Sequence, residues 1–176
     1  MHTEGEAPDN EESVMAVDMF LDIDGVEGES FDETYKGKIQ VLSWSWGESN
    51  QGSGGFGGGQ GAGKVSMQDF SFVMRFCKAS PVLLLHCASG EHFDKAVLTC
   101  RKAGGGKQVE YLKVTFTHLM ISSYQTGASS GGDEYPTDSI SFNYETVEYK
   151  YTTQDAKGKA EDPIPAGWNV KENKKL

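Results

Sequence analysis

Cysteine is scarce in this chain, and its spacing does not suit a disulfide or zinc framework. Among 176 residues there are three cysteines, Cys77, Cys87 and Cys100, with no C-x-x-C pair and an odd total. Small domains held by disulfides carry a dense, even set, and a structural zinc site needs a second ligand pair beside His86 and Cys87. We therefore expect reduced, buried thiols in a cytosolic setting.

Long apolar runs are missing as well. No segment approaches the ~18–20 consecutive apolar residues that cross a bilayer. The N-terminal residues are acidic and lack the apolar region of a secretory signal peptide. The sequence therefore predicts no membrane insertion, and it predicts that any export uses a route other than the general one.

Basic charge is in short supply. The chain has 26 acidic and 16 basic side chains, a formal net charge of −10, and such a surface repels nucleic-acid phosphates and anionic lipids. Five of the excess carboxylates lie in residues 1–14, which contain no Lys or Arg. We predict a disordered acidic extension there, a single domain over residues 15–171, and a C-terminal tail at residues 172–176.

Two ligand-binding motifs are incomplete. The stretch Gly58–Lys64 matches most of a phosphate-binding P-loop, but Val65 stands where a magnesium-binding Ser or Thr is needed. The segment Asp22–Gly25 is similar to part of a calcium loop. That register would place Phe20 and Phe31 where carboxylates are required. We predict no metal and no cofactor.

Catalytic motifs are equally sparse. No Ser lies in a G-x-S-x-G turn and no H-E-x-x-H appears. His86 and Cys87 are adjacent, but neighbouring residues on a helix point away from each other. The sequence predicts that the chain is not an enzyme, although a catalytic triad assembled only by folding leaves no local pattern.

Apolar residues recur mostly with a period of two, which is typical of half-buried strands. A change of phase at Gln68-Asp69 predicts a bulge or bend. The pattern favours an all-β antiparallel sandwich or barrel. We predict strands at Val17–Ile23, Ile39–Gly47, Val65–Phe76, Lys95–Arg101, Gln108–Tyr124, Ser139–Thr152 and Trp168–Val170.

One short helix interrupts the strands. Ser80 is suited to cap its N-terminus, Pro81 to its first turn, and Gly90 to its end, with Val82–Cys87 as its body. The fold class that follows is β with one short α-helix.

The second predicted strand has two contrasting faces. Leu42, Trp44 and Trp46 share one face, and Ser43 and Ser45 share the other. Aligned aromatic residues of this kind form a sugar-stacking platform in some β-sandwich modules, but they more often belong to a core. We expect the core role.

A set of segments, taken in order, resembles the haemolysin-coregulated protein (Hcp) family of type VI secretion systems. The resemblance extends over nearly all of residues 15–171. Residues 1–14 depart from it as an extension, and the loop Asp155–Pro165 is individual to this chain. The matching segments are Met15–Gly25, Val41–Gly47, Gly61–Phe72, Ser80-Pro81, Ser89-Gly90, Arg101–Gly104, Gln108–Leu112, Ile121–Ser123 and Gly167–Val170.

The resemblance implies a β-barrel that closes into a hexameric ring with a wide channel. Such rings stack into a tube that lies inside a contractile sheath and carries a spike protein at its tip. Contraction ejects the tube, and small effectors travel in its channel. The protein would be cytoplasmic before ejection and extracellular afterwards, with no need of a signal peptide.

Two groups of residues are candidates for assembly in such a ring. A glycine-rich loop permits close backbone approach and is expected to contact the next ring, while Ser43 and Ser45 are expected to line the channel. The alternative is a monomeric ligand-binding β-module. The loop glycines are Gly47, Gly52, Gly54, Gly55, Gly57, Gly58 and Gly59.

Overall fold

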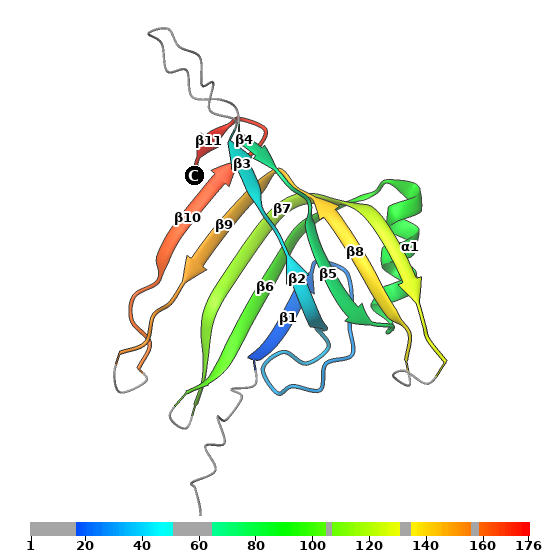
Figure 1. Cartoon of the computed structure of the whole chain (residues 1–176), viewed down its shortest axis with the longest axis horizontal. Helices are drawn as coiled ribbons and strands as arrows, with labels where there is room; N and C mark the ends of the chain where they lie inside the picture. The colour runs from blue at the N-terminus through cyan, green and yellow to red at the C-terminus, as the bar shows by residue number, and fades with distance from the viewer. Residues whose placement is uncertain (1–16, 51–64, 105–106, 131–134, 156–158) are drawn as a thin grey trace, which may run out of the picture.

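The chain folds into a six-stranded antiparallel β-barrel with a strand extension on one side and a helix on the other (Figure 1). The computed structural model describes residues 17–50, 65–104, 107–130, 135–155 and 159–176. Its elements are β1 Val17–Ile23, β2 Ile39–Ser45, β3 Glu48–Asn50, β4 Val65–Met67, β5 Phe70–Arg75, α1 Ala79–Ser89, β6 His92–Gly104, β7 Lys107–Gly127, β8 Thr137–Asn143, β9 Thr146–Tyr151, β10 Ile164–Asn169 and β11 Lys174–Lys175.

The long strand β7 closes the barrel. Its first part pairs with β6 and β9, and its last part, from Met120 to Gly127, pairs with β8. The barrel therefore runs β1–β2–β5–β8–β7–β6 and back to β1. β9, β10 and β11 continue outward from β7 as the extension. The predicted antiparallel β class is confirmed, and the structure selects the barrel over the sandwich.

Aromatic side chains fill the barrel because alternate residues of every strand point inward. Phe70, Phe72, Phe116 and Phe142 are almost fully buried. The ring of Phe70 lies 4.9 Å from that of Phe116 and 5.1 Å from that of Phe142. The core is therefore centred on strands β5, β7 and β8.

A β-bulge in β2 changes the predicted faces of this strand. The pairing with β5 shifts between Val41 and Ser43, so that Leu42 is the extra residue. Leu42 is 41% exposed, whereas Trp44 and Trp46 pack against the core. The prediction that Leu42 shares the face of the two tryptophans is wrong, because one inserted residue reverses the alternation.

The helix begins differently from the prediction. Ser80 lies inside α1, and its hydroxyl does not cap the helix. It accepts a hydrogen bond from the Cys77 backbone N–H and donates one to the fully buried Asp138, at 2.5 Å. The end at Gly90, with a φ of 71°, is as predicted. Among the described residues, no helix has the length and hydropathy needed to cross a bilayer.

Other strand boundaries also differ from the prediction, at positions where the alternation of apolar residues changes register. The predicted strand Ser139–Thr152 is two strands, β8 and β9, with Tyr144 and Glu145 between them. The predicted bend at Gln68-Asp69 separates β4 from β5. Residues 172–176, predicted as a tail, include β11.

Replacing Phe70 with alanine should lower the free energy of unfolding by about 3–5 kcal/mol, because it leaves a cavity among packed rings. Urea unfolding followed by tryptophan fluorescence measures this. Leu85→Ala is the control, because Leu85 is 62% exposed and its replacement should change stability by less than ~0.5 kcal/mol. An unchanged urea midpoint for Phe70→Ala would contradict this description of the core.

Candidate functional site

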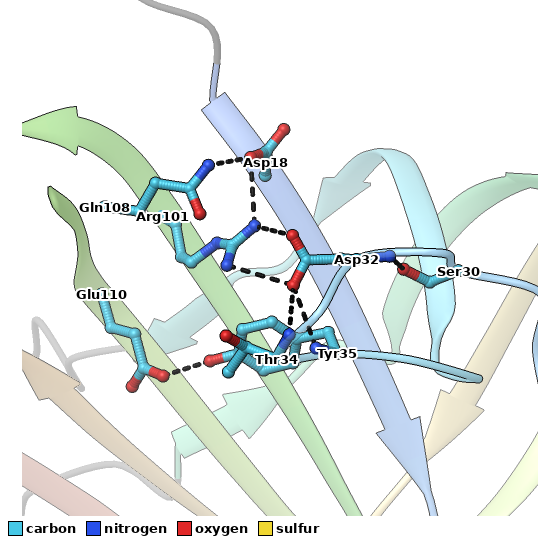
Figure 2. A network of polar contacts seen from close by, with 8 residues as sticks. All are labelled: Asp18, Ser30, Asp32, Thr34, Tyr35, Arg101, Gln108 and Glu110. Carbon is cyan, nitrogen blue, oxygen red and sulfur yellow. Dashed lines mark hydrogen bonds and ion pairs between the residues drawn. The ribbon is translucent and has the colours of Figure 1, made fainter.

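A buried arginine on β6 joins the barrel to the loop between β1 and β2 (Figure 2). The Arg101 side chain is 5% exposed, and its Nη2 donates to Asp32 Oδ2 at 2.5 Å and to Asp18 Oδ2 at 3.2 Å. Its Nη1 donates to Asp32 Oδ1 at 3.2 Å. The two nitrogens thus bind the Asp32 carboxylate in the bidentate geometry that arginine favours. The hydrogen bonds from Arg101 hold the pKa of Asp32 below its ordinary value of 3.8.

Two stacked aromatic rings complete the surroundings of this ion pair. The Phe20 and Tyr35 rings are 4.6 Å apart and nearly parallel. The Arg101 guanidinium lies 4.9 Å from the Phe20 centroid and 5.0 Å from that of Tyr35, within cation–π range. The Tyr35 hydroxyl donates to Glu110, and burial together with that hydrogen bond raises the pKa of Tyr35 to about 12.

The β1–β2 loop, residues 24–38, is ordered by its own hydrogen bonds. Asp32 Oδ1 accepts bonds from the backbone N–H groups of Thr34 and Tyr35, at 2.9 and 3.0 Å. The Gly28 N–H donates to the Gly37 carbonyl at 2.8 Å. A Cβ at Gly28 would lie 2.4 Å from the Lys38 carbonyl oxygen. The backbone can therefore approach Lys38 this closely only with glycine at position 28. These contacts join the two ends of the loop to each other and to its middle.

The loop presents an apolar groove, which we call the Phe31 groove. Phe31 is 96% exposed at its edge, and Leu42, Phe76 and Tyr135 are each about half exposed. The groove measures about 320 Å³. Exposed apolar patches with a polar rim mark contact surfaces. The other lining residues are Glu29, Ser30, Gln40, Arg75 and Cys77.

The predicted assembly residues are only partly described. Ser43 and Ser45 are exposed on β2, on the face opposite the core. Gly47 is half-buried, and a Cβ there would lie 3.0 Å from Gln68 Oε1. The channel and ring-stacking roles of these residues stay predictions. The other glycines, Gly52, Gly54, Gly55, Gly57, Gly58 and Gly59, lie outside the described residues, as does most of the P-loop-like stretch.

The residues considered for chemistry serve packing instead. His86 Nδ1 lies 2.9 Å from the Val82 carbonyl oxygen, and its ring stacks on Phe93 at 4.2 Å. The three thiols are free, with Cys100 buried and Cys77 and Cys87 half-buried. Burial raises the pKa of Cys77 and of Cys100, which disfavours the nucleophilic thiolate. In the described part of the chain, no group of three acidic, His or Cys side chains is placed to hold a metal.

The two tryptophans of the sugar-platform hypothesis also pack inward. Trp44 stacks on Phe70 with ring centroids 5.9 Å apart. The Trp46 indole N–H donates to the Tyr144 hydroxyl, and its ring contacts Tyr149 at 5.4 Å. The core role predicted for them is confirmed.

The charged and aromatic side chains gathered around Arg101, which we call the Arg101 cluster, were not predicted from the sequence. Neither was the Phe31 groove. One signal for the cluster was present: Met19, Phe20 and Leu21 are consecutive apolar residues in a strand. A strand that is apolar on both faces is covered on both faces. Phe20 lies on the face opposite Leu21 and is 4% exposed, because Tyr35 of the loop covers it.

Comparison with known proteins places this structure among type VI secretion proteins. Residues 20–151 match the family model described as "Type VI secretion system effector, Hcp". Protein hcp1 of Pseudomonas aeruginosa is 48% identical over 160 residues, which is 90% of this chain and 98% of that protein. A solved type six secretion system protein superposes with a TM-score of 0.85 at 33% identity, covering 92% of this chain and all of the other. The crystal structure of Hcp1 from Salmonella typhimurium superposes with a TM-score of 0.75 at 36% identity. The match covers 92% of this chain and all of the other.

Asp32→Asn should destabilise the folded chain at neutral pH, because it removes the charge that pairs with buried Arg101. The pKa of Asp32 is lowered in the folded chain, so the ion pair stabilises the fold above about pH 4 and this contribution is lost as the pH falls through the folded-state pKa. The difference in urea midpoint between wild type and variant should therefore be constant from pH 8 to about 5 and shrink below pH ~4.

Asp18→Asn is the matched control for this measurement. Asp18 also binds Arg101, but through one oxygen at 3.2 Å and with a more exposed side chain, 36% against 22% for Asp32. We expect Asp18→Asn to lower the urea midpoint at pH 7 by less than Asp32→Asn does. Equal effects of the two variants, or a difference from wild type that is independent of pH, would contradict the role of Asp32.

Proposed function

This chain belongs to the Hcp family of the type VI secretion system, and we propose that it is a subunit of the inner tube of that system. The observation that carries the proposal is the match to Protein hcp1, which covers nearly the whole length of both chains at 48% identity. In this proposal the protein acts by assembly: six copies form a ring, and rings stack into the tube. It performs no catalysis.

The described surface supports assembly. Ten large apolar side chains are at least 41% exposed among the described residues, and four of them, Phe31, Leu42, Phe76 and Tyr135, gather at one groove. Exposing such area to water is unfavourable at about 25 cal/mol per Å². A ring contact offers a way to bury part of it.

The edge strands support the same proposal. On the side of β10 away from β9, Trp168 and Asn169 pair with β11, and the Gly167 carbonyl accepts a hydrogen bond from the Leu176 N–H. Among the described residues, the edge at residues 164–166 is therefore open. Ile164 on this edge is 61% exposed. An open edge promotes contact between copies. Pro165 limits strand pairing between copies at this edge, because proline has no backbone N–H to donate.

The ring proposal assigns the exposed face of β2 to the channel. Ser43 and Ser45 offer short hydroxyls on that face, which suit a solvated wall along which small effectors travel. The loop glycines from Gly47 to Gly59 would contact the adjacent ring. The partners are then other copies of the chain, a spike protein at the tip, the contractile sheath and the effectors, with the protein cytoplasmic before ejection and extracellular afterwards.

Size-exclusion chromatography with multi-angle light scattering tests the ring directly. The chain has a mass of 19.2 kDa, so a six-membered ring should elute as a species of ~115 kDa, and negative-stain images of that fraction should show rings. A 19.2 kDa monomer at micromolar concentration and physiological salt would contradict the proposal and favour a ligand-binding β-module.

A further inference from the structure

We propose that the cleft between the β3–β4 hairpin and strands β9 and β10 binds an arginine side chain of another polypeptide. We call this cleft, which is lined by Trp46, Glu48, Met67, Tyr149 and Trp168 among others, the Trp168 groove. In Figure 1 it lies at the upper end, where β3 and β4 are drawn beside β10 and β11. Its walls come from one chain, so the inference does not rest on the proposed ring.

Three aromatic side chains form most of the groove. Trp46, Tyr149 and Trp168 are each half-buried, so part of each side chain contributes to the surface of a hollow of about 350 Å³. The rings of Trp46 and Tyr149 are 5.4 Å apart and inclined at 43°. Aromatic faces attract cations, and a guanidinium in particular stacks on them. The walls of the groove therefore suit a flat cation.

Hydrogen bonds connect the Trp46 wall to the rest of the fold. The Trp46 indole N–H donates to the Tyr144 hydroxyl, which donates to the Gln68 carbonyl oxygen at 3.1 Å. The Gln68 N–H in turn donates to the Gly47 carbonyl oxygen at 3.0 Å. A side chain that is already held by such bonds loses little conformational entropy when a ligand binds beside it.

The groove also contains a carboxylate that has no cation partner. Glu48 lines the hollow, and burial together with the nearby Glu48 charge raises the pKa of Tyr149 to about 12. No residue in the described ranges forms an ion pair with Glu48. The combination of aromatic faces with one unpaired negative charge is complementary to a cationic ligand.

The lysines near the C-terminus leave this charge unpaired. Lys171 and Lys174 pair with other carboxylates, at 3.6 and 2.5 Å. Lys175 lies opposite Trp168 in the pairing of β10 with β11, but it is not among the residues that line the groove. A cation that a ligand brings is therefore the partner that Glu48 lacks.

Arginine suits this site better than other cations do. A guanidinium is planar and weakly hydrated, and it can bind a carboxylate through two nitrogens while its face rests on an aromatic ring. The lysine ammonium is a compact and strongly hydrated charge. A quaternary ammonium stacks on aromatic rings but has no N–H to donate to Glu48.

The length of the groove favours a peptide over a free guanidinium compound. Beyond Glu48 and Trp168 the groove continues into a second hollow of about 290 Å³, which these two residues line together with Asn50 and Val65. An arginine side chain would occupy the aromatic hollow, and the residues next to it in the peptide would occupy the second.

A blocked tripeptide, acetyl-Ala-Arg-Ala-amide, tests the site in the full chain. Saturation-transfer NMR measures its binding, and so does tryptophan fluorescence, because two of the three tryptophans line the groove. We expect saturable binding with a Kd on the order of 1 mM, since cation–π contacts and exposed ion pairs are each weak. The same peptide with citrulline for arginine keeps the shape without the charge and should bind about tenfold more weakly.

Glu48→Gln tests the carboxylate. The variant should bind the arginine peptide about tenfold more weakly and the citrulline peptide as the wild type does. Glu48 is exposed in a short strand, so the urea midpoint should stay unchanged. Glu148→Gln is the matched control. Glu148 is next to Tyr149 but on the opposite face of β9, where it pairs with Lys150 at 3.3 Å, so this variant should bind like the wild type.

Several results would overturn the inference. They are the absence of saturable binding, equal binding of the arginine and citrulline peptides, and unchanged binding in Glu48→Gln. A lysine peptide that binds as tightly would overturn the assignment to arginine, and blocked arginine that binds as tightly as the tripeptide would overturn the assignment to a polypeptide. Light scattering of the same samples keeps the two proposals apart: a monomer that binds the arginine peptide would refute the ring and support the groove.

Discussion

The bidentate ion pair between Arg101 and Asp32 fixes how the outside of this barrel is arranged. The two residues are 69 positions apart in sequence, on β6 and in the β1–β2 loop. With Arg101 bound, the loop lies across the outer face of β1 and buries Phe20 against Tyr35. A guanidinium that is 5% exposed is costly unless it is paired, so the loop and the barrel wall depend on each other. The position of Phe31 follows from this, because it precedes Asp32.

The barrel interior follows a simpler rule, and much of it could be predicted from the sequence. Alternation of apolar residues predicted β1 as Val17–Ile23, as found. It also predicted that Phe70, Phe72, Met74 and Phe76 share one face. The first three are buried, but Phe76 lies beyond the end of β5 and is 44% exposed. Gly90 ends the helix because it adopts a left-handed backbone conformation that glycine tolerates. These features depend on nearby residues, which is why a single sequence reveals them.

Features created by long-range pairing could not be predicted in the same way. The bulge at Leu42 depends on the register between β2 and β5, and it turns an expected core residue into part of the Phe31 groove. The Ser80 hydroxyl suits a helix cap but binds Asp138, 58 residues away. The Arg101 cluster unites residues of β1, its following loop, β6 and β7 (Figure 2). Of the assembly residues, the sequence predicted that Ser43 and Ser45 face away from the core, as found. The roles predicted for these serines and for the loop glycines stay predictions.

The proposed tube function requires that this Hcp-family chain forms a ring whose channel is lined by the exposed face of β2. Cryo-electron microscopy of the purified, assembled protein tests it most directly. We expect a closed ring of six barrels with Ser43 and Ser45 on the wall of a continuous central channel. A ring that buries these two serines between subunits or carries them on its outer surface would contradict the channel assignment. Particles of one or two chains with no channel would contradict the ring.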